Sequence, residues 1–84
     1  MEEREIGVVF DYFNQPKVAA IKISGKLKLG DRIEIKGNTT DFEMAVNSMQ
    51  INREDVEEVS VGQSVGIKVL EKVRSGDKVF KLVE

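Results

Sequence analysis

Three pairs of a glycine and a following Asp or Gln lie between stretches rich in aliphatic residues in this chain. The pairs are Gly-Asp at residues 30–31, Gly-Gln at 62–63 and Gly-Asp at 76–77. Glycine tolerates positive φ, and an Asp side chain accepts hydrogen bonds from nearby backbone, so these pairs favour tight turns. We predict that Asp31 and Asp77 are acceptors within their own turns. The unequal spacing indicates corners of one sheet and not the units of a solenoid.

The segments around these turns alternate with the period of a half-buried strand. Leu27 and Leu29 precede the first turn, while Ile33 and Ile35 follow it, each separated by polar residues. The same alternation predicts inward-facing side chains in two further strands, 18–23 and 64–69: Ala19, Ile21, Ile23, Val65, Ile67 and Val69. A last strand is predicted at residues 78–83.

Residues 6–13 are predicted to form the first strand, followed by a hairpin turn at 14–17 that contains the only proline, Pro16. Alternation would place four apolar side chains on one face and two on the other: Ile6, Val8, Phe10 and Tyr12, against Val9 and Phe13. Two largely apolar faces are typical of a strand that is covered on both sides, as in a barrel.

Residues 39–59 fit two patterns. Phe42, Val46 and Met49 have the spacing of a short helix behind a capping box at 40–43. Phe42, Met44 and Val46 also alternate as in a strand, so the pattern alone leaves helix and strand open. Residues 52–55 are predicted to form a polar loop, and 56–59 an extended or one-turn connector. Short strands with turn signals about every 8–12 residues indicate an all-β barrel or sandwich.

Composition excludes several classes of chemistry. The 84 residues suffice for one domain with a small core, and 33% of them are charged. The chain has no Cys and no His, which removes disulfides, thiol nucleophiles and the commonest general base and metal ligand. Its apolar runs are far shorter than a membrane span, and residues 1–5 are acidic, unlike a signal peptide. We expect a cytoplasmic protein.

Charge is segregated along the chain although the net charge is only −2. Residues 17–36 carry six bases and two acids, whereas residues 37–63 carry six acids and Arg53 alone as a base. A basic segment beside an acidic one is compatible with a binding face for phosphate or for a charged partner. The simpler interpretation is that charges alternate on the solvated faces of a small β-domain.

The order of these segments resembles the second domain of elongation factor Tu, a β-barrel of translational GTPases. The resemblance runs from residue 6 to residue 83 and rests on the Gly-Asp turn at 30–31, the strand end at 36–37, and the segments 61–67 and 73–79. It implies strands within residues 39–59. The implied fold is all-β, a single small closed or partly open antiparallel β-barrel of about six to seven strands that spans residues 1–84.

Residues 38–43 and 48–51 are closer still to the C-terminal barrel of the collagenase-like peptidase family. Members of that family have been linked to tRNA base modification. A free-standing barrel of this kind is similar to small archaeal proteins labelled translation elongation factor-like. This resemblance implies an accessory module of translation or tRNA metabolism.

Catalysis is not expected. No Gly-x-x-x-x-Gly-Lys-Ser/Thr loop is present, so we expect no nucleotide binding by the chain alone. The serines have no base to activate them. Asp41 and Glu43 would share a strand face, but two carboxylates do not make a metal site, and we expect them to cap a turn or face water. We expect no cofactor, no metal and no catalytic residue.

Two sets of residues are candidates for RNA binding. Residues 48–53 match the elongation factor segment that helps to hold the aminoacylated end of tRNA. In this resemblance Arg53 matches the family's arginine and Gln50 replaces its glutamate. The alternative for Arg53 is a surface ion pair with Glu54 or Glu57. The second set is basic and would contact phosphates if its members share a face: Lys17, Lys22, Lys26, Lys28, Arg32 and Lys36.

The leading expectation is therefore a non-catalytic module that binds RNA, such as tRNA, weakly, or docks on a tRNA-acting or translation protein. The alternative is a protein–protein adaptor without RNA binding, which would use the acidic residues 54–58 and the apolar edge strands. Clustering of the lysines on one face would favour RNA, and scattering would favour the adaptor. No membrane partner is expected.

Overall fold

A computed structural model describes residues 2–15 and 17–83, with the side chains of residues 3–15 and 17–82. The strands are β1 (Glu2–Phe13), β2 (Val18–Ile23), β3 (Leu27–Lys28), β4 (Arg32–Lys36), β5 (Asp41–Ala45), β6 (Met49–Ile51), β7 (Glu54–Asp55), β8 (Glu58–Val59), β9 (Ser64–Lys68) and β10 (Lys78–Val83). The fold is all-β, as predicted. The described residues include no helix long and apolar enough to cross a membrane.

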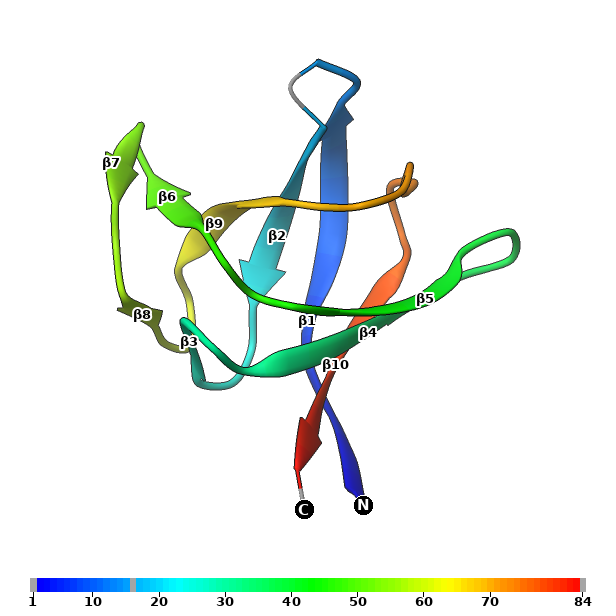
Figure 1. Ribbon diagram of the computed structural model, residues 1–84, viewed down its shortest axis with the longest axis horizontal. Helices are drawn as coiled ribbons and strands as arrows, with labels where there is room; N and C mark the ends of the chain where they lie inside the picture. Colours follow the sequence, from blue (N-terminus) through cyan, green and yellow to red (C-terminus); the bar gives the residue numbers. More distant parts are fainter. Residues whose placement is uncertain (1, 16, 84) are drawn as a thin grey trace.

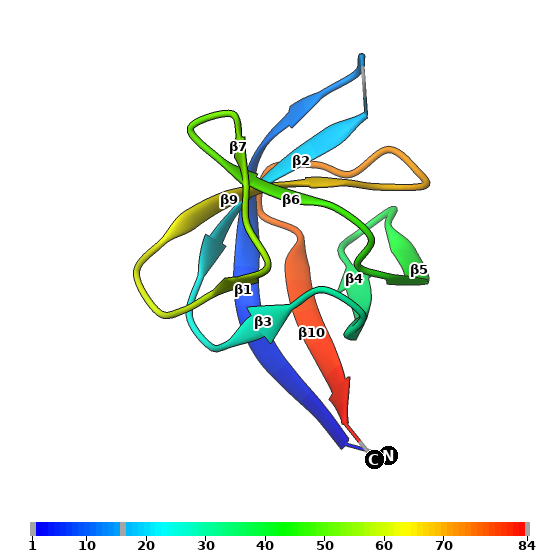
Figure 2. The same cartoon turned by 60° about the vertical axis from the view of Figure 1, so that its left-hand side comes forward.

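Two antiparallel sheets make up the structure. The larger has eight strands in the order β5-β4-β10-β1-β2-β9-β6-β7, and the smaller pairs β3 with β8. Figure 1 shows the large sheet curling around the molecule, with β1 and β10 side by side down its centre. The first and last strands meet where Glu2 pairs with Val83, and both ends of the chain lie together in Figure 2.

The end strands of the large sheet, β5 and β7, have no ladder between them in the described part of the chain. The small sheet continues by one backbone hydrogen bond, from Leu29 N to Glu57 O at 2.9 Å. Gly30 N, just after β3, donates to Val46 O, just after β5, at 2.9 Å. The structure also has ten strand elements where six to seven were predicted, because ladders of two or three residues flank the turns. The curled sheet is therefore all-β without a continuous closed ladder.

The core follows the predicted alternation in the strands that lack irregularities. The following predicted inward residues are buried: Ala19, Ile21, Ile23, Leu27, Ile33, Ile35, Val65, Ile67 and Val69. Leu29, which was predicted to alternate with Leu27, is 40% exposed because it lies in the turn after β3. Burial of the Val, Leu and Ile side chains among the buried residues contributes about 1.5–3 kcal/mol each. These positions hold β2, β4 and β9 around one hydrophobic core.

The first strand departs from simple alternation. Ile6 and Val9 are buried, but Phe10 and Phe13 are each 51% exposed. The pairing register shifts between Glu5 and Gly7 on the β10 side, and between Val9 and Asp11 on the β2 side. An extra residue at each bulge reverses the side that later side chains face. The predicted common face for Ile6, Val8, Phe10 and Tyr12, and the predicted cover on both sides, are therefore wrong.

Residues 39–59 are extended, as the family resemblance implied, and the helical alternative is wrong. Met44, Val46 and Met49 are buried. The polar loop predicted at 52–55 is shorter than expected: only Asn52 and Arg53 form the turn, and β6 and β7 pair on either side of it. The hairpin predicted at 14–17 joins β1 to β2, while Pro16 lies outside the described residues.

Candidate functional site

Three turns with one shared geometry shape the surface of the domain. We call residues 28–31, 60–63 and 74–77 the first, second and third glycine turns. Their glycines have φ of 93°, 93° and 97°. In each turn the backbone N–H of the last residue donates to the carbonyl of the first, at 3.1, 3.2 and 3.0 Å. A glycine with positive φ at the third position is what a type II turn requires.

A side chain closes each glycine turn in the same way. The first residue's N–H donates to Asp31 Oδ2 at 3.0 Å, to Gln63 Oε1 at 2.8 Å and to Asp77 Oδ2 at 2.8 Å. The predicted acceptor roles of Asp31 and Asp77 are thus confirmed. Gln63 performs the same task and was missed, although its place after Gly62 was a usable signal.

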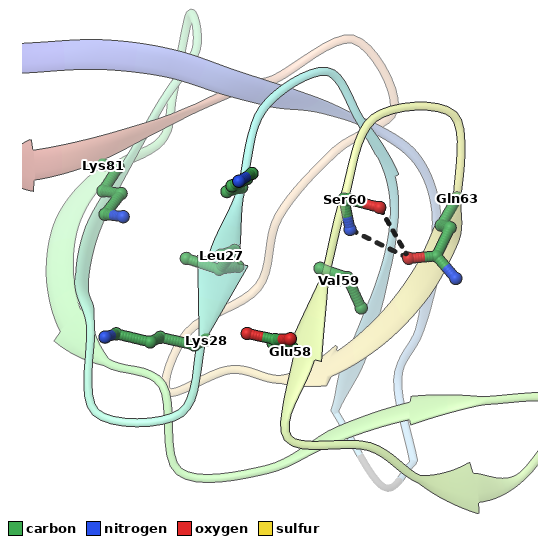
Figure 3. A pocket seen from close by; sticks show the side chains of 8 residues that line it. Leu27, Lys28, Glu58, Val59, Ser60, Gln63 and Lys81 are labelled. Carbon is green, nitrogen blue, oxygen red and sulfur yellow. Dashed lines mark hydrogen bonds between the residues drawn. The ribbon is translucent and has the colours of Figure 1, made fainter.

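A cavity of about 400 Å³ lies between the first and second glycine turns. Its floor contains Leu27 and Val59, which pair across β3 and β8 and are almost fully buried. The charged and polar side chains around it are Lys26, Lys28, Lys81, Glu58, Ser60 and Gln63. Figure 3 shows Lys28, Lys81, Glu58, Ser60 and Gln63 around the β3–β8 ladder. Ammonium groups outnumber carboxylates on the cavity wall, which favours an anionic ligand.

Asp31 connects this cavity to β10. Its Oδ2 accepts from the backbone N–H of Lys28 at 3.0 Å and lies 3.3 Å from Lys81 Nζ. The Asp31 and Lys81 side chains are only 15% and 24% exposed, so solvent screens this pair less than a fully exposed pair. One carboxylate oxygen thereby fixes the backbone of one cavity lysine and the side chain of another.

Lys81 was not among the predicted binding residues. It belongs to the last strand, and its partner Asp31 lies on a turn far away in the sequence. Local alternation placed Lys81 on a strand without indicating what it would face. The structure brings it together with two predicted residues, Lys26 and Lys28.

Three other predicted basic residues have intramolecular partners. Lys22 Nζ donates to Gly62 O at 3.0 Å. Arg32 pairs with Glu43 at 3.4 Å, while Lys36 lies 3.0 Å from Glu34 and 3.5 Å from Glu3. The six basic residues therefore do not form one unopposed face. Lys17, exposed on the β1–β2 hairpin, contributes its backbone carbonyl to Val69 N at 2.9 Å.

Lys36 sits in a small charged cluster on the outer face of the large sheet. The pKa of Glu3 is raised, chiefly because its carboxyl shares a hydrogen bond with that of Glu34. The same hydrogen bond, together with one from Lys36, lowers the pKa of Glu34. The pKa of Lys36 is raised, mainly by its hydrogen bond with Glu34. Lys36 Nζ also lies 5.8 Å from the centre of the Phe80 ring.

Gln50 and Arg53 belong to the β6–β7 hairpin. Gln50 Nε2 donates to Asp55 Oδ1 at 3.0 Å, across the ladder. Arg53 is exposed and has φ of 66°. Its predicted alternative, an ion pair with Glu54 or Glu57, does not occur in the described structure. Arg53 therefore presents its guanidinium to solvent, while the Gln50 amide is held on the sheet.

Metal-binding clusters of three or more carboxylates are absent from the described residues. Asp41 and Glu43 are both exposed on β5, where Glu43 is the partner of Arg32. The expectation that this pair faces water is confirmed. The described side chains place no base next to a serine hydroxyl: Ser60 contacts Gln63, and Ser75 donates to the carbonyl of Phe10.

Comparisons with known proteins point to one group. No family model matches the chain. The chain is 46% identical over 81 residues to an uncharacterized protease of Methanocaldococcus jannaschii, and this match covers 95% of the chain and 20% of that protein. It is 37% identical over 78 residues to a collagenase of Porphyromonas gingivalis, covering 90% of this chain and 22% of the relative. The chain thus spans about a fifth of the length of these curated relatives.

Solved structures agree on the fold. The C-terminal domain of a Geobacillus thermoleovorans protein assigned to the U32 peptidases superposes with a TM-score of 0.88 at 17% identity, covering 94% of this chain and 92% of that one. Its selenomethionine variant gives a TM-score of 0.86, covering 90% and 96%. The chain is thus similar to about a fifth of proteins named as a protease and a collagenase, and its all-β fold is that of the C-terminal domain of a protein assigned to the U32 peptidases.

Proposed function

We propose that this chain is a non-catalytic accessory module that recognises RNA, tRNA in particular, for an enzyme of the U32 peptidase type in the cytoplasm. The accessory role is supported by the homologues, in which the matched segment is about a fifth of a longer protein. The lack of catalysis is supported by the absence of His and Cys from the sequence. On this proposal the chain binds the substrate and the partner enzyme supplies the chemistry.

The conformation and exposure of Arg53 are the main support for RNA recognition. It occupies the second position of a two-residue hairpin turn, after Asn52 with φ of 53°. Such turns require positive φ at both positions, and glycine is strongly preferred at the second. A non-glycine residue in this conformation costs roughly 1–2 kcal/mol. A strained arginine with a solvent-facing guanidinium is suited to pairing with phosphate or stacking on a base.

We infer that the curled sheet is a barrel of the kind found in the second domain of elongation factor Tu. The three glycine turns support this, since they fall at the positions on which the resemblance rests and share one geometry. In that arrangement the β6–β7 hairpin is the segment that corresponds to the tRNA-contacting segment of the elongation factor.

A titration of the ¹⁵N-labelled protein with bulk tRNA, followed by amide chemical shifts, tests this function. Shifts that include the amides of residues 50–55 and shrink between low and moderate salt are expected, because phosphate contacts release counterions. The Arg53→Gly variant keeps a residue suited to the turn and should lose these shifts. An unchanged spectrum at low salt would refute RNA recognition.

A protein adaptor is the second candidate. One supporting observation is that the six basic residues do not form one unopposed face, which was the stated criterion in favour of an adaptor. The other is the exposed acidic strip along β7 and β8, which contains Glu54, Asp55, Glu57 and Glu58. This strip would repel RNA phosphates and attract a basic protein surface. If tRNA causes no shifts, titration with the catalytic part of a U32-type relative should shift the amides of residues 54–58.

A further inference from the structure

We propose that the cavity between the first and second glycine turns binds phosphate through the side chains of Lys26, Lys28 and Lys81. The bound phosphate group belongs either to an RNA backbone or to free phosphate in solution. The RNA source rests on the proposed function, whereas the site itself does not. This site lies apart from the β6–β7 hairpin and would give the domain a second contact with a nucleic acid strand.

The charges of the lining residues favour an anion. The cavity wall carries three ammonium groups and the Glu58 carboxylate, and one of the three, that of Lys81, is already paired with Asp31. Lys26 and Lys28 have no side-chain ion pair or hydrogen bond with any residue that the structure describes, which distinguishes them from Lys22, Arg32 and Lys36. Exposed lysines without a carboxylate partner are the ones that phosphate can engage without first breaking an ion pair.

The direction of Lys28 is the second observation. Lys28 lies directly opposite Glu58 in the β3–β8 ladder, where an ion pair across the strands would be expected. Figure 3 shows instead that the Lys28 amine points away from Glu58 and extends to the same side of β3 as Lys81. Because the Asp31 carboxylate already balances the Lys81 ammonium, an anion held on this side of the cavity would chiefly balance the Lys28 ammonium.

Asp31 accounts for the placement of both lysines. Its Oδ2 holds the backbone N–H of Lys28 at 3.0 Å and the Lys81 ammonium at 3.3 Å. The buried Leu27 and Val59 fix the strands beneath. The backbone of Lys28 and the side chain of Lys81 are thus positioned before phosphate binds, whereas the Lys26 and Lys28 side chains become ordered only on binding.

Inorganic phosphate and tRNA, titrated separately into the ¹⁵N-labelled protein, test the site. The test variant is Lys26→Gln with Lys28→Gln, since both side chains are exposed and their loss leaves the core intact. The control is Lys68→Gln with Lys72→Gln, which removes the same charge from exposed positions outside the cavity. Both doubles should keep the wild-type dispersion of amide signals, which reports folding.

Phosphate is expected to shift the amides of residues 26–28 and 58–63 in the wild type and in the control, but not in the test variant. With tRNA, the test variant should lower the slope of log affinity against log salt by about 1.4–1.8, since each phosphate contact contributes about 0.7–0.9. The control should change this slope by less than half as much.

Two results separate this site from the proposed function. If phosphate shifts the cavity amides and tRNA shifts none, the anion site stands and RNA recognition fails. If tRNA shifts only the β6–β7 hairpin and phosphate leaves the cavity amides unchanged, RNA recognition stands and the cavity site is refuted. Equal effects of the test and control variants would also overturn the site, because they would indicate a general charge effect.

Discussion

The Asp31 carboxylate and the Lys81 ammonium lie 3.3 Å apart and join the first glycine turn to the last strand. Because both side chains are largely buried, we expect Asp31→Asn to lower the free energy of unfolding by about 1–2 kcal/mol, through the loss of a charge-assisted hydrogen bond. Urea denaturation at neutral pH measures this change.

The control for that prediction is Glu43→Gln, which breaks the more exposed Arg32–Glu43 pair, with side chains 59% and 46% exposed. Exposed pairs contribute little, so a change below about 0.5 kcal/mol is expected. Equal losses in the two variants would contradict the special role of Asp31.

Gly37 is expected to tolerate no side chain. A Cβ there would lie 2.6 Å from Asp77 Cγ, and Asp77 cannot move freely because its carboxylate closes the third glycine turn. Gly37→Ala should therefore cost about 2–4 kcal/mol of unfolding free energy, as overpacking beside a held, buried polar group does. Thermal and urea unfolding would report this loss.

Gly62→Ala provides the matched comparison. No atom lies within 4 Å of a Cβ built on Gly62, so only the positive φ of 93° opposes the substitution. A cost of about 1 kcal/mol is expected, and Gly62→Asn should cost less because Asn tolerates this conformation. If Gly62→Ala were as damaging as Gly37→Ala, contact with Asp77 would not be the cause at Gly37.

The Glu3–Glu34 pair predicts two pH dependences of opposite sign. The pKa of Glu3 is raised in the folded state, so its ionisation disfavours folding as the pH rises above the ordinary value of 4.5. Glu3→Gln cannot ionise and should raise the melting temperature at pH 7. This gain should shrink toward zero as the pH falls below 4.5, where the wild-type carboxyl is protonated.

Glu34 behaves in the reverse way because its pKa is lowered. Its contribution to stability is present above the ordinary value of 4.5 and is lost as the pH falls through its folded-state pKa. Glu34→Gln should therefore lower the melting temperature at pH 7, and this loss should diminish in acid. Melting curves of both variants and the wild type, recorded from pH 3 to pH 7 in steps of about half a pH unit, measure the sign of each change in melting temperature. Two changes of the same sign would contradict the shared hydrogen bond.

Arg53→Gly is expected to stabilise the fold while weakening RNA binding. Glycine removes the strain of positive φ at residue 53, so the unfolding free energy should rise by about 0.5–1 kcal/mol. Urea denaturation measures the gain, and the tRNA titration measures the loss. Arg53→Lys keeps a charge in the same backbone conformation and separates the two effects. A destabilised Arg53→Gly protein would contradict the strain argument.

Periodicity predicted the interior of the regular strands. In β2, β4 and β9 each inward residue could be named in advance, because alternation along a strand depends only on neighbouring residues. The same rule was wrong for Phe10, since the bulges of β1 are set by pairing with β10 and β2. Residues 39–59 stayed undecided by pattern because Phe42 and Val46 satisfy both periods.

The candidate site was only partly predictable. Lys26 and Lys28 were among the predicted basic residues, but so were Lys22, Arg32 and Lys36, which the fold engages with carbonyl or carboxylate partners. Lys81 and Gln63 were missed. Charge along the sequence does not distinguish a lysine with a partner from one without.

The sequence by itself determined the all-β class, the alternating core positions and the three glycine turns, because each depends on φ preferences and side-chain pattern within a few residues. Only the tertiary structure decided that Asp31 would join Lys28 to Lys81, and that the first and second turns would enclose a cavity. These contacts link residues as far apart as Asp31 and Lys81, and only the pairing of β3 with β8 and of β4 with β10 brings them together.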